Sequence, residues 1–189
     1  MTSPQELNLP PGCALIEVHV ADLKQLFHSL DPTPFRERDI DPKAEAFIAG
    51  WARELGADTP LALVVHVDHD VPAQAQITDL QGAIRDYFKE RALQTRRQLR
   101  QLFRVGRTSL AIGLVFLGAF ILAGDLVATM LSATRFAGIA RESLLIGGWV
   151  AMWRPLEVFL YDWWPIRAEA RLLDRLSAMA VRVVPSRSV

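Results

Sequence analysis

The residues with the clearest chemical potential in this 189-residue chain are charged side chains inside apolar stretches. Asp125 interrupts the apolar run 108–131, and Arg154 and Glu157 interrupt a second run, 143–164. Such charges are costly in an apolar environment, so they normally pair and often serve a function. Counting 1.5 Å per residue from the loop between the runs, we expect one group in which Arg154 lies between Asp125 and Glu157.

Two interpretations of this charge group stay open. It can lock two helices together, which small residues such as Gly113 and Gly124 favour because they let helices approach closely. It can also line an ion or solute path, which two helices per chain would form only as an oligomer. No motif for phosphate binding, nucleophilic catalysis or metalloprotease chemistry is present, so we expect no enzymatic activity and no cofactor.

A second set of polar residues falls on two predicted strands. The runs 13–20 and 61–67 are rich in Val, Ile and Leu and predict strands. Because side chains alternate along a strand, the apolar residues share one face and the other face carries four polar ones: Glu17, His19, His66 and Asp68. These residue types could bind zinc or another divalent ion, although their order has no recognised ligand spacing. The alternative is an ordinary solvent-facing side of a small sheet.

The apolar runs predict membrane spans. As a helix, the 24 residues of 108–131 are long enough to cross a hydrocarbon core of about 30 Å. The run 143–164 either spans as a whole or enters as a half-span over 143–153. A full span is favoured by the aromatic residues expected at a membrane interface, namely Tyr161, Trp163 and Trp164.

Basic residues flank the predicted spans. The segment 85–107 has eight Lys and Arg against two acids, and 165–189 has five against two. This distribution places both termini in the cytoplasm. The arginines before the first span either contact anionic lipid or only set the orientation. The balanced total of 21 bases and 21 acids does not favour a nucleic-acid binder, and the single cysteine, Cys13, excludes an intrachain disulfide.

The expected fold is an α+β cytoplasmic domain followed by an α-helical transmembrane hairpin. The domain contains two strands plus helices in β-α-α-β-α order, with helices over 21–30 and from Asp41 onward. The expected divisions are a cytoplasmic domain at 1–75, a basic amphipathic stalk helix at 76–107, transmembrane helices at 108–131 and 143–164 joined by an external loop at 132–142, and a basic cytoplasmic tail at 165–189. The amino terminus has no signal-peptide pattern.

Two stretches also support a family resemblance. Residues 142–166, ESLLIGGWVAMWRPLEVFLYDWWPI, and 34–41, PFRERDID, together resemble an uncharacterised family of bacterial two-span inner-membrane proteins. Its members share a W-R-P-x-E and a Y-D-W-W-P signature after a small cytoplasmic domain. The resemblance implies a bacterial inner-membrane location and carries over no catalytic or ligand roles.

These patterns predict an integral membrane protein that acts as a membrane-anchored interaction or assembly module. Its expected partners are a bilayer with anionic lipids and either further copies of itself or an unidentified protein, with no nucleic acid. One alternative is a subunit of an oligomeric ion or small-solute channel that uses Asp125, Arg154 and Glu157. Another is a metal-sensing membrane protein that uses the polar face of the sheet.

Overall fold

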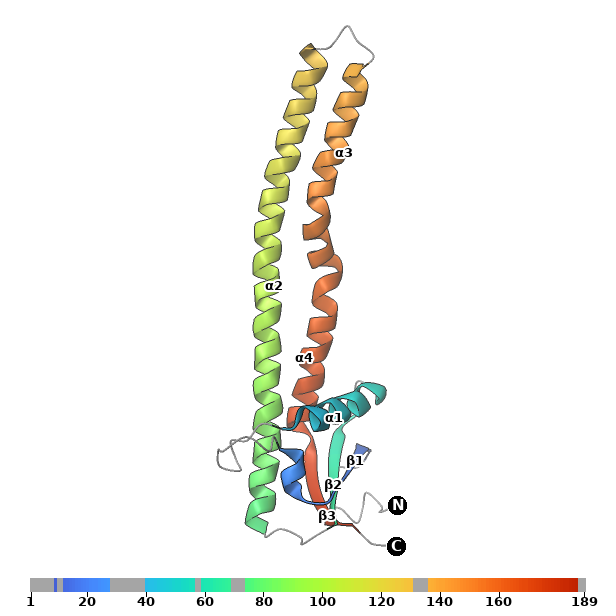
Figure 1. The fold of residues 1–189 in the computed structure, drawn as a ribbon, viewed down its shortest axis with the longest axis vertical. Coiled ribbons are helices and arrows are strands. Elements are labelled where there is room, and N and C mark those ends of the chain that lie inside the picture. The colour runs from blue at the N-terminus through green and yellow to red at the C-terminus, as the bar shows by residue number, and fades with distance from the viewer. Residues whose placement is uncertain are drawn as a thin grey trace. The chain divides into compact units, whose positions relative to one another are not determined.

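A computed structural model describes residues 9, 12–27, 40–56, 59–68, 74–130 and 136–186. The described chain is mostly helical, with a small three-stranded parallel sheet and two long apolar helices (Figure 1). It divides into two compact units, one made of Met1–Gln94 with Ala168–Val189 and the other of Thr95–Arg167. The first unit, here called the sheet unit, therefore contains residues from both sides of the second, here called the hairpin unit.

The sheet consists of β1 (Ala14–Val20), β2 (Leu61–Val67) and β3 (Ala180–Pro185) in that order. Both strand pairs are parallel, with Ile16 opposite Leu63 and Val65 opposite Val183. The two predicted strands are present, but the two-strand prediction omits β3, which lies in the segment expected to be a basic tail. A six-residue strand that pairs with a partner more than 100 residues earlier has no local signal beyond its valines.

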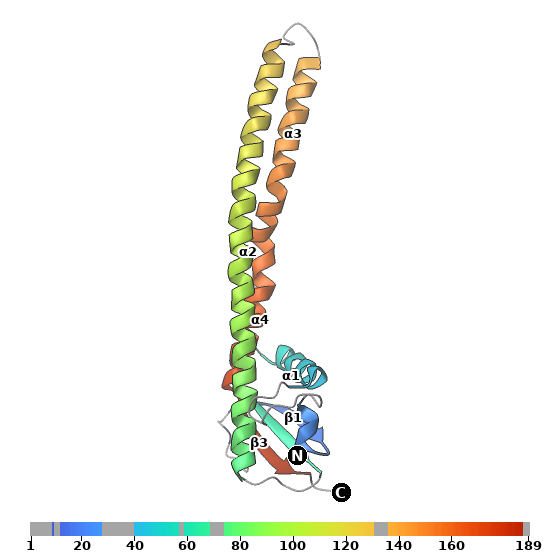
Figure 2. The same cartoon turned by 60° about the vertical axis from the view of Figure 1, so that its left-hand side comes forward.

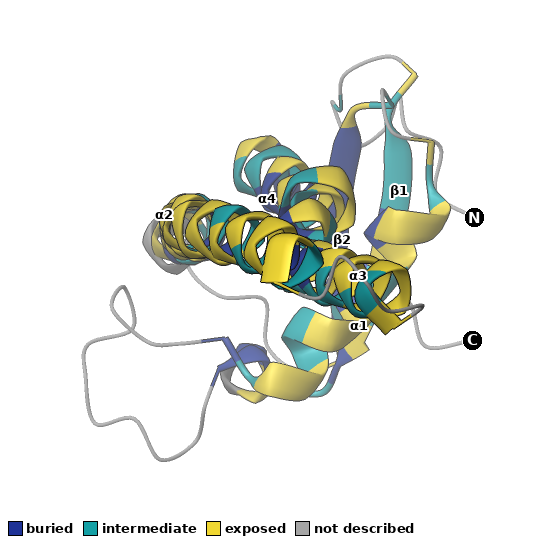
Figure 3. Cartoon of the chain, turned by 90° about the horizontal axis from the view of Figure 1, so that it is seen from above, coloured by how far each residue is buried: buried dark blue, intermediate teal, exposed yellow. Residues whose placement is uncertain are grey.

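One face of the sheet forms the core of the sheet unit. Ile16 on β1, Leu63 and Val65 on β2 and Val181 on β3 are buried there. As predicted, the apolar residues of the first two strands share this face. Figure 3 colours the chain by the burial of each residue. The covering side chains come from three helical segments of the chain. They are Ile48 and Ala52 from the first segment, Leu80, Ile84 and Phe88 from the second, and Leu172, Leu173 and Leu176 from the third.

The first covering helix is α1 (Pro42–Glu54). It begins as predicted, because the Asp41 carboxylate accepts a hydrogen bond from the Lys43 N–H at 2.9 Å and Pro42 occupies the first turn. The helix expected at 21–30 is replaced by a single 3₁₀ turn, η1 (Leu23–Leu26), within its described part. The reason is that Phe27 pairs with Ile40 in an isolated bridge, which draws the backbone out of the helix. The stretch 34–39 lies outside the described residues.

Within the sheet unit, side-chain contacts fasten α1 to the helical segments that precede and follow the hairpin unit in the sequence. The Tyr87 hydroxyl donates to the Glu45 carboxylate at 2.7 Å, and Arg91 forms an ion pair with the same carboxylate. Arg53 donates to both carboxylate oxygens of Glu169 at 2.9 Å. The segment expected to be a tail is thus an integral part of the sheet unit.

The long helix α2 (Gln74–Met130) is continuous over 57 residues, or about 85 Å. The helix runs without interruption from the segment expected to be a stalk into the first apolar run. The second arm begins with α3 (Phe136–Glu157), continues through a π-helical turn η3 (Val158–Asp162) and ends with α4 (Trp163–Ala178). Helix α3 starts seven residues before the predicted second span, so part of the expected loop 132–142 is helical.

Both arms contain a helix long and apolar enough to cross a membrane, by length and composition. The candidate spans lie within Ile77–Met130 and Phe136–Ala178, and only 11% and 22% of their most apolar windows are buried in the protein. A core helix of a soluble protein would be mostly buried. Within the hairpin unit, α2 and α3 run side by side (Figure 2).

Candidate functional site

Glycines set the register between the two arms of the hairpin unit. A Cβ built on Gly113 would lie 3.1 Å from the Ala151 carbonyl oxygen, and one on Gly124 would lie 3.4 Å from Cγ of Arg141. In each of these two contacting pairs, the two residue numbers add up to about 265. Because both helices rise about 1.5 Å per residue in opposite directions, residues whose numbers sum to about 265 lie at the same level.

This register separates the charges that were expected to form one group. Asp125 pairs with Arg141 at 3.0 Å, at the level that the sum predicts. Arg154 lies 18 residues after the start of α3, about 27 Å along the helix, whereas Asp125 is five residues from the end of α2, about 8 Å. The expected contact of Asp125 with Arg154 is therefore absent. The miscount arose because the second helix begins at Phe136 rather than Ser143.

Arg154 instead belongs to an ion network confined to its own arm. Its guanidinium lies 3.1 Å from the Glu157 carboxylate, as expected for an i, i+3 pair, and 3.2 Å from the Asp162 carboxylate. Glu157 also accepts a hydrogen bond from Nε1 of Trp153 at 2.8 Å. The side chain of Arg154 is 63% exposed, so this network lies on the outside of the hairpin.

The π-helical turn explains why Asp162 reaches Arg154. On a regular α-helix, residues i and i+8 are about 80° apart, while i and i+7 differ by only about 20°. A π-helical turn adds one residue, so position i+8 takes the place of i+7. The sequence signal that accompanies this turn is Pro155, which cannot donate the backbone hydrogen bond of its own turn.

Aromatic side chains lie close to the level of this ion network along the hairpin. Trp153, Tyr161 and Trp164 are 67%, 71% and 64% exposed. Trp163, which was expected to be an interface anchor with Tyr161 and Trp164, contacts Phe103 of α2, with ring centroids 6.4 Å apart. The register places Arg154 level with residue 111, near the start of the apolar run 108–131 rather than its middle.

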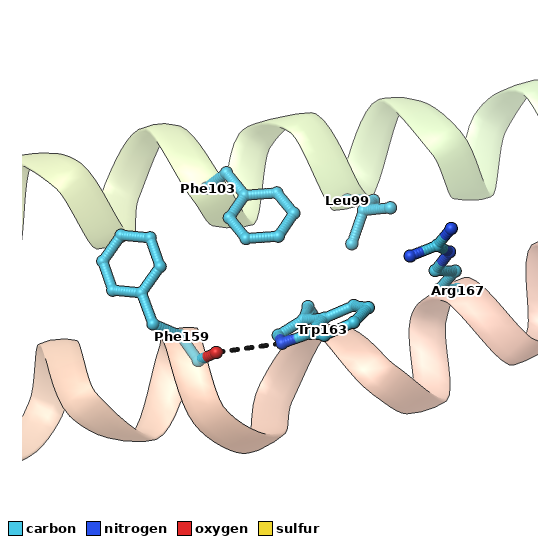
Figure 4. Close-up of a pocket in the computed structure, with 5 residues that line it drawn as sticks. All are labelled: Leu99, Phe103, Phe159, Trp163 and Arg167. Atoms are coloured by element: carbon cyan, nitrogen blue, oxygen red, sulfur yellow. Dashed lines mark hydrogen bonds between the residues drawn. The ribbon is translucent and has the colours of Figure 1, made fainter.

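An open groove lies next to Trp163, between the two arms of the hairpin unit. It has a volume of about 380 Å³ and is lined by Leu99, Phe103, Phe159, Trp163 and Arg167 (Figure 4). Nε1 of Trp163 donates to the Phe159 carbonyl oxygen at 2.9 Å, which holds the indole in place. The Arg167 guanidinium lies 5.6 Å from the centroid of that ring. Sequence reasoning missed this groove because its residues come from distant parts of the chain.

The polar side chains of the sheet unit come together only in part. The rings of His19 and His66 stack at 4.3 Å with an angle of 7°, and Nε2 of His66 lies 3.9 Å from the Glu17 carboxylate. Burial lowers the pKa of His66, with a smaller effect in the same direction from His19, while Glu17 opposes it. Asp68, just beyond β2, is exposed.

This arrangement does not support the metal site considered from the sequence. Imidazole lone pairs lie in the ring plane, so two rings stacked face to face direct them along parallel planes rather than toward one ion. Among the residues that the structure describes, no group of three or more His, Cys, Asp or Glu side chains is disposed to hold a metal ion.

No protein-family model, curated protein or solved structure matches this chain.

Proposed function

We propose that this protein crosses the bacterial inner membrane twice and anchors a cytoplasmic sheet domain that serves as an assembly module. The observation that carries this proposal is the pairing of β2 with β3. These strands stand before and after the hairpin unit in the chain, so both flanks of the hairpin fold into one domain. One folded domain occupies one side of a membrane, which requires an even number of crossings between its two parts.

The hairpin offers one continuous apolar zone for a bilayer. Between Arg107 and Asp125, α2 has 17 residues without a charge, which is about 26 Å and close to the thickness of a hydrocarbon core. Large apolar side chains are exposed there, including Val115 and Leu122 at 71% and 72%. The Asp125–Arg141 pair would then mark the outer boundary of this zone, and Arg154 with its aromatic neighbours would lie near the inner one.

The arginine distribution supports a cytoplasmic sheet domain. Five arginines precede the apolar zone on α2, namely Arg96, Arg97, Arg100, Arg104 and Arg107. Positive residues beside a span are retained on the cytoplasmic side. The resemblance of 142–166 to bacterial two-span proteins agrees with this orientation. It also favours the bacterial inner membrane as the location.

The assembly role is supported by the sheet itself. Strand β1 lies at one edge of the three described strands, and one side of its backbone has no described strand beside it. Such an edge can accept another strand. We favour a second copy of the chain, because two β1 edges related by a twofold axis would pair antiparallel and bury both edges.

The channel alternative has less support. Arg154 forms its contacts within its own arm, and the register separates it from Asp125 by about 20 Å along the hairpin. The two charges therefore do not share the intramembrane path that this alternative needs.

Labelling of single cysteines tests the topology. In a Cys13→Ser background, we would place one cysteine at Phe136, the exposed first residue of α3, and another at Ala178, the exposed last residue of α4. An impermeant maleimide should label Phe136→Cys in intact spheroplasts, and Ala178→Cys only after lysis. Equal labelling of both sites in intact spheroplasts would rule out the hairpin, and the reverse pattern would rule out the orientation.

A further cysteine tests the assembly. Glu17 is the exposed midpoint of β1, so it would lie beside the twofold axis of a symmetric antiparallel edge pair. In the same background, Glu17→Cys should form a covalent dimer with a short bismaleimide in native membranes. The matched control is Glu54→Cys, exposed at the end of α1. Equal dimer yields from the two variants, or no dimer from either, would contradict pairing through β1.

A further inference from the structure

The groove at Trp163 has a polarity gradient along the hairpin. By the register of the two arms, Phe159 lies level with residue 106 and Arg167 with residue 98. The apolar end of the groove, at Phe159 and Phe103, is thus nearer the apolar zone than the charged end at Arg167. Figure 4 shows this order, with Arg167 at the opposite end of the groove from Phe159.

We infer that this groove binds one anionic phospholipid of the inner leaflet. The inference rests on the proposed membrane hairpin. The Phe159 and Phe103 end would take the upper part of an acyl chain, and Arg167 would bind the headgroup phosphate. Leu99 lies eight residues, or about 12 Å, from Arg107 at the inner limit of the apolar zone. The groove therefore lies on the cytoplasmic side of that zone, with its apolar end nearest the hydrocarbon.

The groove is suited to an anion at its charged end. Arg167 lies over the Trp163 ring, and that ring is itself held by its hydrogen bond to Phe159. A guanidinium positioned over an aromatic ring keeps its N–H groups available for the oxygens of a phosphate. The neighbouring acid Asp162 is paired with Arg154, and α2 has five arginines and no acid between 95 and 107.

The size of the groove favours a lipid over a protein segment. Its volume of about 380 Å³ falls in the range of sites for small ligands. A helix from a second copy is about 10 Å wide and needs an extended apolar face rather than a short groove that ends in a charge. The phosphate and the upper acyl chain of a phospholipid match the order of the charged and apolar ends of the groove.

The test uses the full-length protein in vesicles that contain trace amounts of spin-labelled phosphatidylglycerol or phosphatidylcholine. The motionally restricted fraction of each label reports its relative association with the protein. We expect a preference for phosphatidylglycerol that falls about fivefold in Arg167→Gln and is retained in Arg167→Lys. The matched control is Arg97→Gln, which removes the same charge from an exposed position outside the groove.

A second variant tests the apolar end. Leu99→Trp fills the groove from α2 and keeps Arg167, so it should lower the restricted phosphatidylglycerol signal while leaving that of phosphatidylcholine unchanged. Equal losses in Arg167→Gln and Arg97→Gln would show only diffuse attraction to the surface and overturn the site. An absence of restricted lipid of either kind would instead show that the hairpin does not enter the bilayer, which refutes the proposed function as well.

Discussion

Arg154 and Asp162 are eight residues apart on one helical arm, yet their side chains meet at 3.2 Å. The π-helical turn at Val158–Asp162 makes this contact geometrically accessible. The same arginine also contacts Glu157, so one cation stands between two carboxylates. The network is partly exposed, which limits its contribution to stability, but its three charges depend on one another.

Neutralising Arg154 alone should therefore lower the stability of the protein more than neutralising Arg154 together with one of its carboxylate partners. In Arg154→Gln, two carboxylates lose their shared cation, and we expect a loss on the order of 1 kcal/mol in the free energy of unfolding. Arg154→Gln combined with Asp162→Asn should recover part of that loss. Thermal unfolding in lipid nanodiscs measures the stability of both variants. Additive losses in the double variant would show that the two residues do not interact.

The register of the hairpin can be tested by exchanging charges. Because Asp125 pairs with Arg141, Asp125→Arg should destabilise the hairpin and the exchange Asp125→Arg with Arg141→Asp should restore it. The matched control combines Asp125→Arg with Arg154→Asp, which should give no recovery because those residues lie at different levels. Melting temperatures in the same nanodiscs show which of the two exchanges restores stability. Recovery by the control exchange would mean that the arms are paired in another register.

Gly106 should tolerate a methyl group poorly. A Cβ there would lie 2.6 Å from Cγ1 of Val158, closer than real contacts allow, so Gly106→Ala should destabilise the hairpin unit by about 1–3 kcal/mol. A Cβ on Gly118 would meet no described heavy atom within 4 Å, so Gly118→Ala should be neutral or stabilising by up to about 1 kcal/mol.

A companion change separates the clash from any loss of flexibility at Gly106. Val158→Ala shortens the opposing side chain and should rescue most of the stability lost in Gly106→Ala. Chemical denaturation of the detergent-solubilised protein is a suitable measurement. If Gly106→Ala and Gly118→Ala proved equally destabilising, the close approach of the arms at Gly106 would be disproved.

His66 should make the sheet unit less stable in acid. Burial lowers its pKa below the ordinary 6.5, and the neighbouring His19 acts in the same direction. The folded state therefore binds fewer protons than the unfolded state at mildly acidic pH. Its contribution to stability is complete above about pH 6.5 and declines as the pH falls toward the lowered pKa of the folded protein.

The measurement is the melting temperature between pH 7.5 and 5 for the parent protein and for His66→Phe, which keeps an aromatic ring against His19. Glu17 on β1 opposes the shift, and Arg182 on β3 is the remaining charged residue on this face of the described strands. His66→Phe should flatten the decline. An unchanged pH profile in that variant would assign the acid sensitivity to other groups.

Periodicity and composition determined much of this protein before any contact was known. The apolar alternation of β1 and β2, the Asp41-Pro42 start of α1 and the unbroken course of α2 are local properties, since each depends on residues within a few turns of one another. The two apolar helices follow from composition in the same way. The pairing of Arg154 with Glu157 was also predictable, because residues three apart on a helix are neighbours.

Tertiary structure decided the features that depend on distant residues. Strand β3 exists as a strand because β2 offers it a parallel edge, and its own six residues carry little signal. The partner of Asp125 depends on where α3 begins and how the arms align, while Asp162 reaches Arg154 only through an inserted π-helical residue. The groove at Trp163 combines side chains from two arms, so no single stretch of sequence contains it. Register between helices comes from packing across the whole unit, and local sequence patterns do not encode it.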